Sequence, residues 1–485
     1  MGEATVLQRL GKVANLVLLL SATLSLIIFG FLVWRHGLSL SYIGFLGLAA
    51  ILAFGVRLPE SIRINSTLCM LSILLAVYST ELLLAYSGSS ITALGAQAWL
   101  SFPQDANVKV AAERMKTVQK THQKFDVRTR LEVIRAMRAQ GVNAYPDVFP
   151  MVLFAPSSGT TIQSVLTSND EEFLPVGGMS TTTTVFCNES GEYVVYESDE
   201  HGFNNPRGMW EKRPVEILAL GDSYTHGVCV SSDKGFVAVV RSQHPHTMNL
   251  GVNSHGPLTS LVTLKEYGPI LKPKLILWFY YEGNDLRDLD GWEKSSPLLM
   301  KYLASSFSQR LFERQDEIDR SLRTYLDTAM AKAEASASLE QILKLHHLRH
   351  TIQSFYNRRS AEQGFPVELL DFLRQTGAPA APADLRLFEQ ILAEAQATAK
   401  TWEGRVVFVY LPTWERYRMP ELASKDRDNV LGIARRLNLQ VVDMHTVFSA
   451  HPDPLSLFPF RRYAHYNEAG HRLVGEEVLR QLRLL

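Results

Sequence analysis

Apolar residues concentrate at the N-terminal end of the chain. Three apolar runs cover residues 14–34, 38–56 and 64–86. A helix of roughly 20 residues, rising 1.5 Å per residue, crosses the ~30 Å hydrocarbon core of a bilayer. Buried core helices are the alternative, but three successive runs with almost no charged residue inside them favour membrane spans. We therefore expect residues 1–88 to form a three-helix transmembrane anchor.

The charges around these runs predict their orientation. Arg9 and Lys12 precede the first run, and Arg57 and Arg63 lie between the second and the third, whereas the first loop carries Arg35. Positive residues favour the cytoplasmic side, so the N-terminus is expected in the cytoplasm. Three crossings then place the rest of the chain outside. The expected location is a bacterial inner membrane, with the C-terminal domain in the periplasm.

After the apolar runs the pattern changes twice. Residues 89–149 are polar with helical spacing, which predicts a helical connector. Residues 150–214 contain short β-branched and aromatic runs such as "TTTTVF" and "EYVVYES", separated by Gly, Asn, Ser and Asp. This pattern predicts a small β-rich segment packed on the domain that follows.

From residue 215 to 485, apolar strands alternate with amphipathic helices. "VEILAL", "TMNLGV", "LILWFYYE", "RVVFVYLP" and "LQVVDM" are the expected strands. Continuous apolar strands alternating with helices predict an α/β, flavodoxin-like three-layer domain with a parallel sheet. Between about 289 and 380 the alternation stops and long charged helical patterns take over. We expect a helical insertion there, which covers the active edge, docks a partner, or forms a solvated arm.

The charge balance, the spacing of possible metal ligands and the number of cysteines exclude some classes of function. Lys+Arg and Asp+Glu both number 49, and no basic stripe is present, so a nucleic-acid partner is not expected. No cluster of His, Cys, Asp and Glu has the spacing of a metal site, and we expect no metal and no cofactor. Cys187 and Cys229 both fall in the exported part, where an oxidising compartment favours a disulfide between them. Two buried thiols are the alternative.

Four polar stretches each follow a strand or begin a helix. They are "GDSYTHG" at 221–227, "NLGVNSHGP" at 249–257, "YYEGNDL" at 280–286 and "RYAHYNEAGH" at 462–471. Parallel sheets bind ligands beyond the carboxyl ends of their strands, so these stretches are expected at one edge. In this order they resemble the four blocks of the SGNH (GDSL-type) serine hydrolases, over the chain from residue 215 onward without the insertion.

The resemblance implies roles for individual residues. Ser223 corresponds to the nucleophile and His465 to the base that removes its proton. The oxyanion that forms during attack on an ester needs fixed donors. These correspond to the backbone N–H of Ser223, a backbone N–H near Ser254, with Gly256 as a second candidate, and the side-chain amide of Asn284.

The chain departs from the family pattern at the orienting acid. The family's Asp lies three residues before the His, where this chain has Arg462. Asp453 is taken as the acid of the site and Asp443 as another candidate. A backbone carbonyl holding the imidazole, which would make a Ser-His dyad, is the third option.

Two other features receive no catalytic role. His226, His255 and His471 are expected to serve packing or to lie at the surface. Asn188-Glu-Ser matches the glycosylation pattern, which short sequences also match by chance.

The expected function is a membrane-anchored, extracytoplasmic serine esterase that acts on ester-linked acyl groups such as acetyl, through an acyl-serine intermediate. Membrane-anchored members of the family resemble the machinery that acetylates cell-surface polysaccharides. An O-acetyltransferase for surface glycans, working beside a multi-spanning membrane acyltransferase, is therefore an alternative. A third hypothesis is a non-catalytic scaffold or glycan-binding subunit of a membrane complex. It is motivated by the absence of the family's orienting acid three residues before His465.

Overall fold

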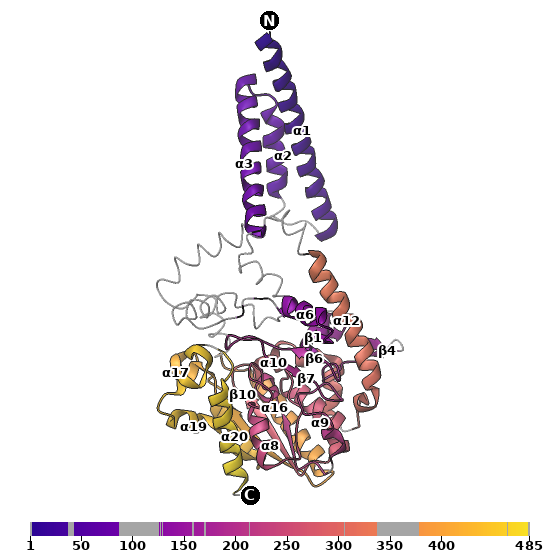
Figure 1. The fold of residues 1–485 in the computed structure, drawn as a ribbon, viewed down its shortest axis with the longest axis vertical. Helices are drawn as coiled ribbons and strands as arrows, with labels where there is room; N and C mark the ends of the chain where they lie inside the picture. Colours follow the sequence, from indigo (N-terminus) through magenta and orange to yellow (C-terminus); the bar gives the residue numbers. More distant parts are fainter. Residues whose placement is uncertain are drawn as a thin grey trace. The chain divides into compact units, whose positions relative to one another are not determined.

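A computed structural model describes residues 2–36, 43–86, 126, 128, 130–157, 160–168, 171–212, 214–304, 306–336, 378–462 and 464–483. The chain divides into two compact units (Figure 1). One contains residues 1–89, and the other contains most of the chain from residue 90 onward. Each unit is described by itself.

The described residues of the first unit form three helices. Helix α1 (Gly2–His36) packs against α2 (Ile43–Gly55) and α3 (Glu60–Tyr86). By length and composition, Arg9–Ile27 in α1 and Glu60–Thr80 in α3 are long and apolar enough to cross a membrane. Helix α2 has 13 residues, about 20 Å at 1.5 Å per residue, which is shorter than the hydrocarbon core. The third crossing and the orientation therefore stay predictions.

The second unit is built on a five-stranded sheet. Its strands are β8 (Ile217–Leu220), β9 (Thr247–Asn249), β10 (Leu275–Tyr281), β11 (Arg405–Leu411) and β12 (Gln440–Asp443). All neighbours are parallel, in the spatial order β12-β11-β10-β8-β9. This is the flavodoxin-like order 2-1-3-4-5. The predicted α/β class and the parallel sheet are confirmed.

Side chains of each strand alternate between two hydrophobic cores, one on each face of the sheet. Helices α9 (Pro257–Leu271) and α16 (Pro382–Lys400) pack together on one face, where Trp278 and Phe408 contribute to the core. Helices α8 (Phe236–Gln243) and α20 (Glu468–Leu482) cover the other. Both faces are buried, which explains why the strands are continuously apolar. Other helices of this unit are α6 (Arg130–Ala139), α7 (Ser223–His226), α17 (Glu415–Arg418), α18 (Arg427–Arg436) and α19 (Met444–Ala450).

The β-rich segment has its own small sheet. Strands β1 (Ala144–Pro146), β6 (Thr183–Val185) and β7 (Val195–Glu197) pair side by side. Because β1 pairs with β6, this segment begins before the predicted boundary at 150. Two hairpins complete it, formed by β2 (Phe154–Pro156) with β3 (Ile162–Ser164) and by β4 (Thr167–Ser168) with β5 (Glu171–Glu172). Its apolar residues join the same core as α9 and α16.

The described part of the insertion is helical and packs against the β-rich segment. It contains α10 (Asp285–Gly291), α11 (Pro297–Met300) and α12 (Gln315–Ser336). In α12, Asp319 accepts hydrogen bonds from the N–H of Ser180 at 2.8 Å and from its hydroxyl at 2.6 Å. Through these hydrogen bonds α12 binds the β-rich segment, so it does not form a solvated arm. Residues 337–377 of the predicted insertion lie outside the described residues.

Candidate active site

Ser223 lies at the first turn after strand β8, which pairs with β9 and β10 on its two sides. The chain leaves the strand through Gly221, whose φ is 149°. A Cβ at that position would lie 2.7 Å from the carbonyl oxygen of Phe279, so only glycine fits. Ser223 then begins α7, where a first-turn N–H has no partner within the helix. The sharp turn places a buried serine at the carboxyl edge of the sheet.

Asp222 holds this turn in place. Its carboxylate accepts the N–H of Tyr224 at 2.9 Å and contacts the hydroxyl of Ser223 at 3.3 Å. Burial raises the pKa of Asp222 to about 6, against hydrogen bonds from Tyr224, Ser223 and the Asn284 side chain and the charge of His465. The Asn284 amide is therefore within hydrogen-bond reach of the residue next to Ser223.

His465 faces the serine from the loop before the last helix. Its Nε2 lies 2.9 Å from the Ser223 hydroxyl, and its ring packs against that of Tyr224 with centroids 4.8 Å apart. Asn467 caps α20 by accepting the N–H groups of Ala469 and Gly470. Its amide also binds the carbonyl of Ser456. The capped helix fixes the loop, so the structure brings together the two residues that the motifs pair as nucleophile and base.

The residue that orients His465 is Glu189, which the sequence analysis did not select. Its Oε1 lies 3.2 Å from Nδ1 of His465, and its Oε2 accepts the backbone N–H of His465 at 2.8 Å. Nδ1 therefore donates to the carboxylate while Nε2 stays free to accept the serine proton; this tautomer is assigned from the partners. Ser223, His465 and Glu189 form the arrangement of a Ser-His-acid triad.

The predicted orienting acid, Asp453, was the wrong choice. Its carboxylate forms an ion pair with Arg461 and is partly exposed to solvent. Asp443 also serves elsewhere, because it caps α19 through the N–H of His445 and pairs with Arg427. With Glu189 in place, neither these carboxylates nor a backbone carbonyl is needed to hold the imidazole.

The turn that carries Glu189 is fixed on both sides. The predicted disulfide between Cys187 and Cys229 is present and joins the turn to the segment that follows α7. The amide of Asn188 donates to the carbonyl of Asp126 at 2.7 Å and accepts the N–H of Gly191 at 3.0 Å. The glycosylation-like motif thus has a structural explanation. The predicted pairing of Cys187, two residues before Glu189, with Cys229 just past the nucleophile is the sequence signal that could have indicated Glu189.

Three of the four residues predicted to supply oxyanion donors, Ser223, Ser254 and Asn284, lie at neighbouring strand ends. Ser254 is buried in the loop after β9 with a φ of 57°, a left-handed backbone at the place where the family has glycine. Asn284 is buried directly before α10, and its Nδ2 donates to Asp288 at 2.9 Å. An amide nitrogen carries two hydrogens, and the second one is directed to the carboxylate of Asp222. Ser223, Ser254 and Asn284 follow the three adjacent strands β8, β9 and β10.

Gly256 belongs to a different contact. The Glu293 carboxylate accepts the N–H groups of Leu258 and Thr259 at 2.9 Å each and that of Gly256. It therefore caps the N-terminus of α9, and a Cβ at Gly256 would lie 2.7 Å from it. The assignment of Gly256 to the oxyanion hole is corrected, because its N–H is already bound and its small size admits Glu293.

One potential metal-binding group was not visible from sequence spacing. Among the described residues, Glu189, Cys229 and His465 bring ligand atoms within 4.8 Å of one another. The sulfur of Cys229 is bonded to Cys187, so it offers no thiolate in this state.

Comparisons with known proteins give matches only among solved structures. No protein-family model matches the chain. No curated protein matches it either. A putative lipolytic protein of the G-D-S-L family from Desulfitobacterium hafniense is 14% identical with a TM-score of 0.29, covering 55% of this chain and 98% of its own. A G-D-S-L lipolytic protein from Veillonella parvula is 16% identical with a TM-score of 0.30, covering 56% of this chain and 99% of its own.

An acetyl xylan esterase is also similar, at 11% identity and a TM-score of 0.30, covering 55% of this chain and 100% of its own. The chain therefore resembles G-D-S-L lipolytic proteins and esterases among the solved structures. At these TM-scores the likeness does not decide the activity. The sheet order and the side chains of the site carry that inference.

Proposed function

We propose that this protein is a serine esterase of the SGNH type that acts on ester-linked acyl groups. The observation that carries the proposal is the continuous chain of contacts from Ser223 through His465 to Glu189. A serine hydroxyl becomes an effective nucleophile when an adjacent base removes its proton, and a third group must orient that base. All three parts are present, and the acid whose apparent absence motivated the scaffold reading is Glu189.

The mechanism follows from these contacts. The Ser223 hydroxyl oxygen attacks the ester carbonyl carbon while His465 Nε2 takes the proton. Glu189 stabilises the imidazolium that forms. The N–H groups of Ser223 and Ser254 bind the oxyanion, and the Asn284 amide joins them by exchanging its hydrogen bond to Asp222 for one to the oxyanion. The intermediate collapses, the alcohol leaves with the proton from His465, and a second acceptor then attacks the acyl-serine.

The proposal also places the enzyme at a bacterial inner membrane, with its active domain on the periplasmic side. Two observations support this placement. Helices α1 and α3 have the length and composition of membrane spans. The disulfide beside the site suits an oxidising compartment.

The decisive test compares the full chain, purified in detergent, with its Ser223→Ala variant. With p-nitrophenyl acetate as substrate, loss of the nucleophile should lower kcat by about 10³–10⁶-fold. Ser231→Ala removes an exposed serine that binds Asp233 and serves as the matched control. A rate in Ser223→Ala equal to that of the wild type would overturn the proposal. Adding short oligosaccharides distinguishes the acceptors: free acetate alone indicates hydrolysis, and acetyl on sugar indicates transfer.

A further inference from the structure

A disulfide sulfur lies directly beside the acid and the base of the site. The Cys229 sulfur, a ring nitrogen of His465 and a carboxylate oxygen of Glu189 are all within 4.8 Å of one another. Cys229 is buried with a φ of 64°, and its bond to Cys187 joins the segment after α7 to the Glu189 turn. The cross-link therefore brings a sulfur close to the two groups that control the proton of Ser223.

Reduction of the disulfide would make the Cys229 sulfur available as a metal ligand. A phosphine and water convert the disulfide into two thiols and a phosphine oxide, a two-electron step in which the phosphorus is oxidised. A dithiol reductant gives the same two thiols and becomes a disulfide itself. The freed Cys229 thiol loses its proton when it binds a metal. The site then offers a thiolate, an imidazole and a carboxylate, which is a ligand set typical of zinc.

The distances suit this ion. Zinc binds sulfur at about 2.3 Å and nitrogen or oxygen at about 2.0–2.2 Å in a tetrahedral arrangement, which places ligand atoms roughly 3–4 Å apart. The three atoms of this site already lie within 4.8 Å of one another, so small side-chain movements bring them into range. Zinc bound here would occupy His465 and Glu189, and Ser223 would lose its base.

We propose that the Cys187–Cys229 disulfide masks a three-ligand Zn²⁺ site, and that reduction opens this site and allows zinc to inhibit the enzyme. The inhibition rests on the proposed function, whereas the metal binding does not. Oxidation of the two thiols by a protein disulfide restores the active arrangement. The same bond would then both position Glu189 and keep metal away from the triad.

Two cysteine variants separate this proposal from a purely structural role of the disulfide. Cys187→Ser and Cys229→Ser both remove the cross-link, but only Cys187→Ser leaves a thiol beside His465. Both are made in a Cys69→Ser background, because Cys69 is an exposed free cysteine that would otherwise bind metal or form mixed disulfides. The full chain is used in detergent, and its circular dichroism and melting temperature report folding.

The experiment titrates Zn²⁺ alone against a chromophoric chelator and measures p-nitrophenyl acetate hydrolysis in parallel. The phosphine-reduced Cys69→Ser parent and the Cys187→Ser variant should each bind one zinc per chain. The oxidised parent and Cys229→Ser should bind at least about tenfold more weakly, since a tetrahedral site loses one of its three protein ligands. Zinc should inhibit hydrolysis only in the forms that bind it.

Equal zinc affinity of Cys187→Ser and Cys229→Ser, or no binding by the reduced parent, would overturn the proposal. If the cysteine variants do not fold, the reduced and oxidised forms of the parent still decide it. Zinc binding by the reduced parent in a protein whose oxidised form has no Ser223-dependent hydrolysis would leave the metal site standing and remove the proposed function.

Discussion

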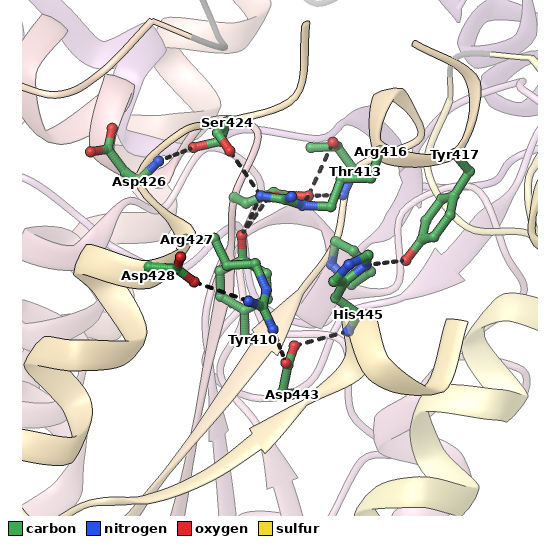
Figure 2. Close-up of polar contacts among 12 residues, drawn as sticks. Tyr410, Thr413, Arg416, Tyr417, Ser424, Asp426, Arg427, Asp428, Asp443 and His445 are labelled. Carbon is green, nitrogen blue, oxygen red and sulfur yellow. Dashed lines mark hydrogen bonds and ion pairs between the residues drawn. The ribbon is translucent and has the colours of Figure 1, made fainter. Parts of the chain in front are cut away.

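Two polar clusters lie at the carboxyl edge of the same sheet and use their charges differently. The first is the triad beyond β8. The second follows β10, β11 and β12 and centres on Glu282, Arg416 and Arg427. Figure 2 shows Arg416 and Arg427 with their neighbours Tyr410, Thr413 and Asp443. Glu282 accepts the N–H of Thr413 at 2.6 Å and the Nε–H of Arg416, and Tyr410 donates its hydroxyl hydrogen to the same carboxylate.

In the second cluster, Glu282 and the two arginines are each paired with a side chain of opposite charge. The Glu282 side chain is 0% exposed and pairs with Arg416, and Arg427 pairs with Asp443 and Asp428. In the first cluster, Nε2 of His465 faces the neutral hydroxyl of Ser223, and only Nδ1 meets a carboxylate. In this molecule the paired charges of the second cluster anchor loops, whereas the reactive Nε2 of His465 in the first cluster faces a hydroxyl group.

The largest expected effect comes from removing Glu189, the acid of the triad. In Glu189→Gln, an amide replaces the carboxylate that binds Nδ1, so the imidazole loses its preferred tautomer and the charge that stabilises its protonated form. We expect kcat for p-nitrophenyl acetate to fall by about 10³–10⁴-fold. Asp453→Asn is the matched control, because Asp453 pairs with exposed Arg461 and does not contact His465. Similar losses in both variants would contradict the assignment of Glu189.

Sequence patterns predicted the sheet and four of the site residues, Ser223, Ser254, Asn284 and His465, because these depend on local regularities. Continuous apolar strands specified a sheet buried on both faces. Ser223, Asn284 and His465 each follow a strand or precede a helix, which are positions that a chain pattern reveals.

Glu189 could not be predicted in this way because it comes from outside the alternating pattern. The β-rich segment contributes it, and the disulfide spans 42 residues of sequence to hold it near Ser223. Gly256 was misassigned for a similar reason. The Glu293 carboxylate that occupies its N–H comes from the start of the helical insertion, and no local pattern indicates that contact.

A second prediction tests whether the cluster around Glu282 stabilises the fold rather than taking part in catalysis. Arg416→Met leaves the buried Glu282 carboxylate without its cationic partner, which should lower the free energy of unfolding by about 3–5 kcal/mol. Arg427→Met is the matched comparison, because its Asp443 pair is partly exposed. It should cost about 1 kcal/mol or less. Denaturant unfolding of the full chain in detergent measures both. The kcat per folded Arg416→Met molecule should fall far less than in Glu189→Gln; the reverse order would make Arg416 part of the catalytic site.

The smallest expected effect concerns a residue that supports the oxyanion loop. His226, at the end of α7, accepts the N–H of Asn253 through Nδ1 at 3.2 Å, and its Nε2 lies 2.9 Å from the hydroxyl of Tyr196. Burial lowers the pKa of His226 to about 3, so the ring stays neutral and Nδ1 keeps its acceptor role throughout the working pH range. This contact fixes the peptide that precedes Ser254.

His226→Leu should therefore misplace one oxyanion donor and lower kcat by about tenfold with little change in KM, less than the 10²–10³-fold cost of removing a donor outright. His226→Asn keeps an acceptor oxygen near the position of Nδ1 and should retain kcat within about threefold, since the bond to Asn253 survives. Steady-state kinetics at fixed pH separate the two variants. Equal losses in both, accompanied by equal losses of thermal stability, would mean that His226 serves packing against Phe186 rather than the oxyanion loop. A difference in kcat alone would show that His226 contributes to catalysis by holding the Asn253 peptide next to the Ser254 donor, a role that no side chain has in the cluster around Glu282.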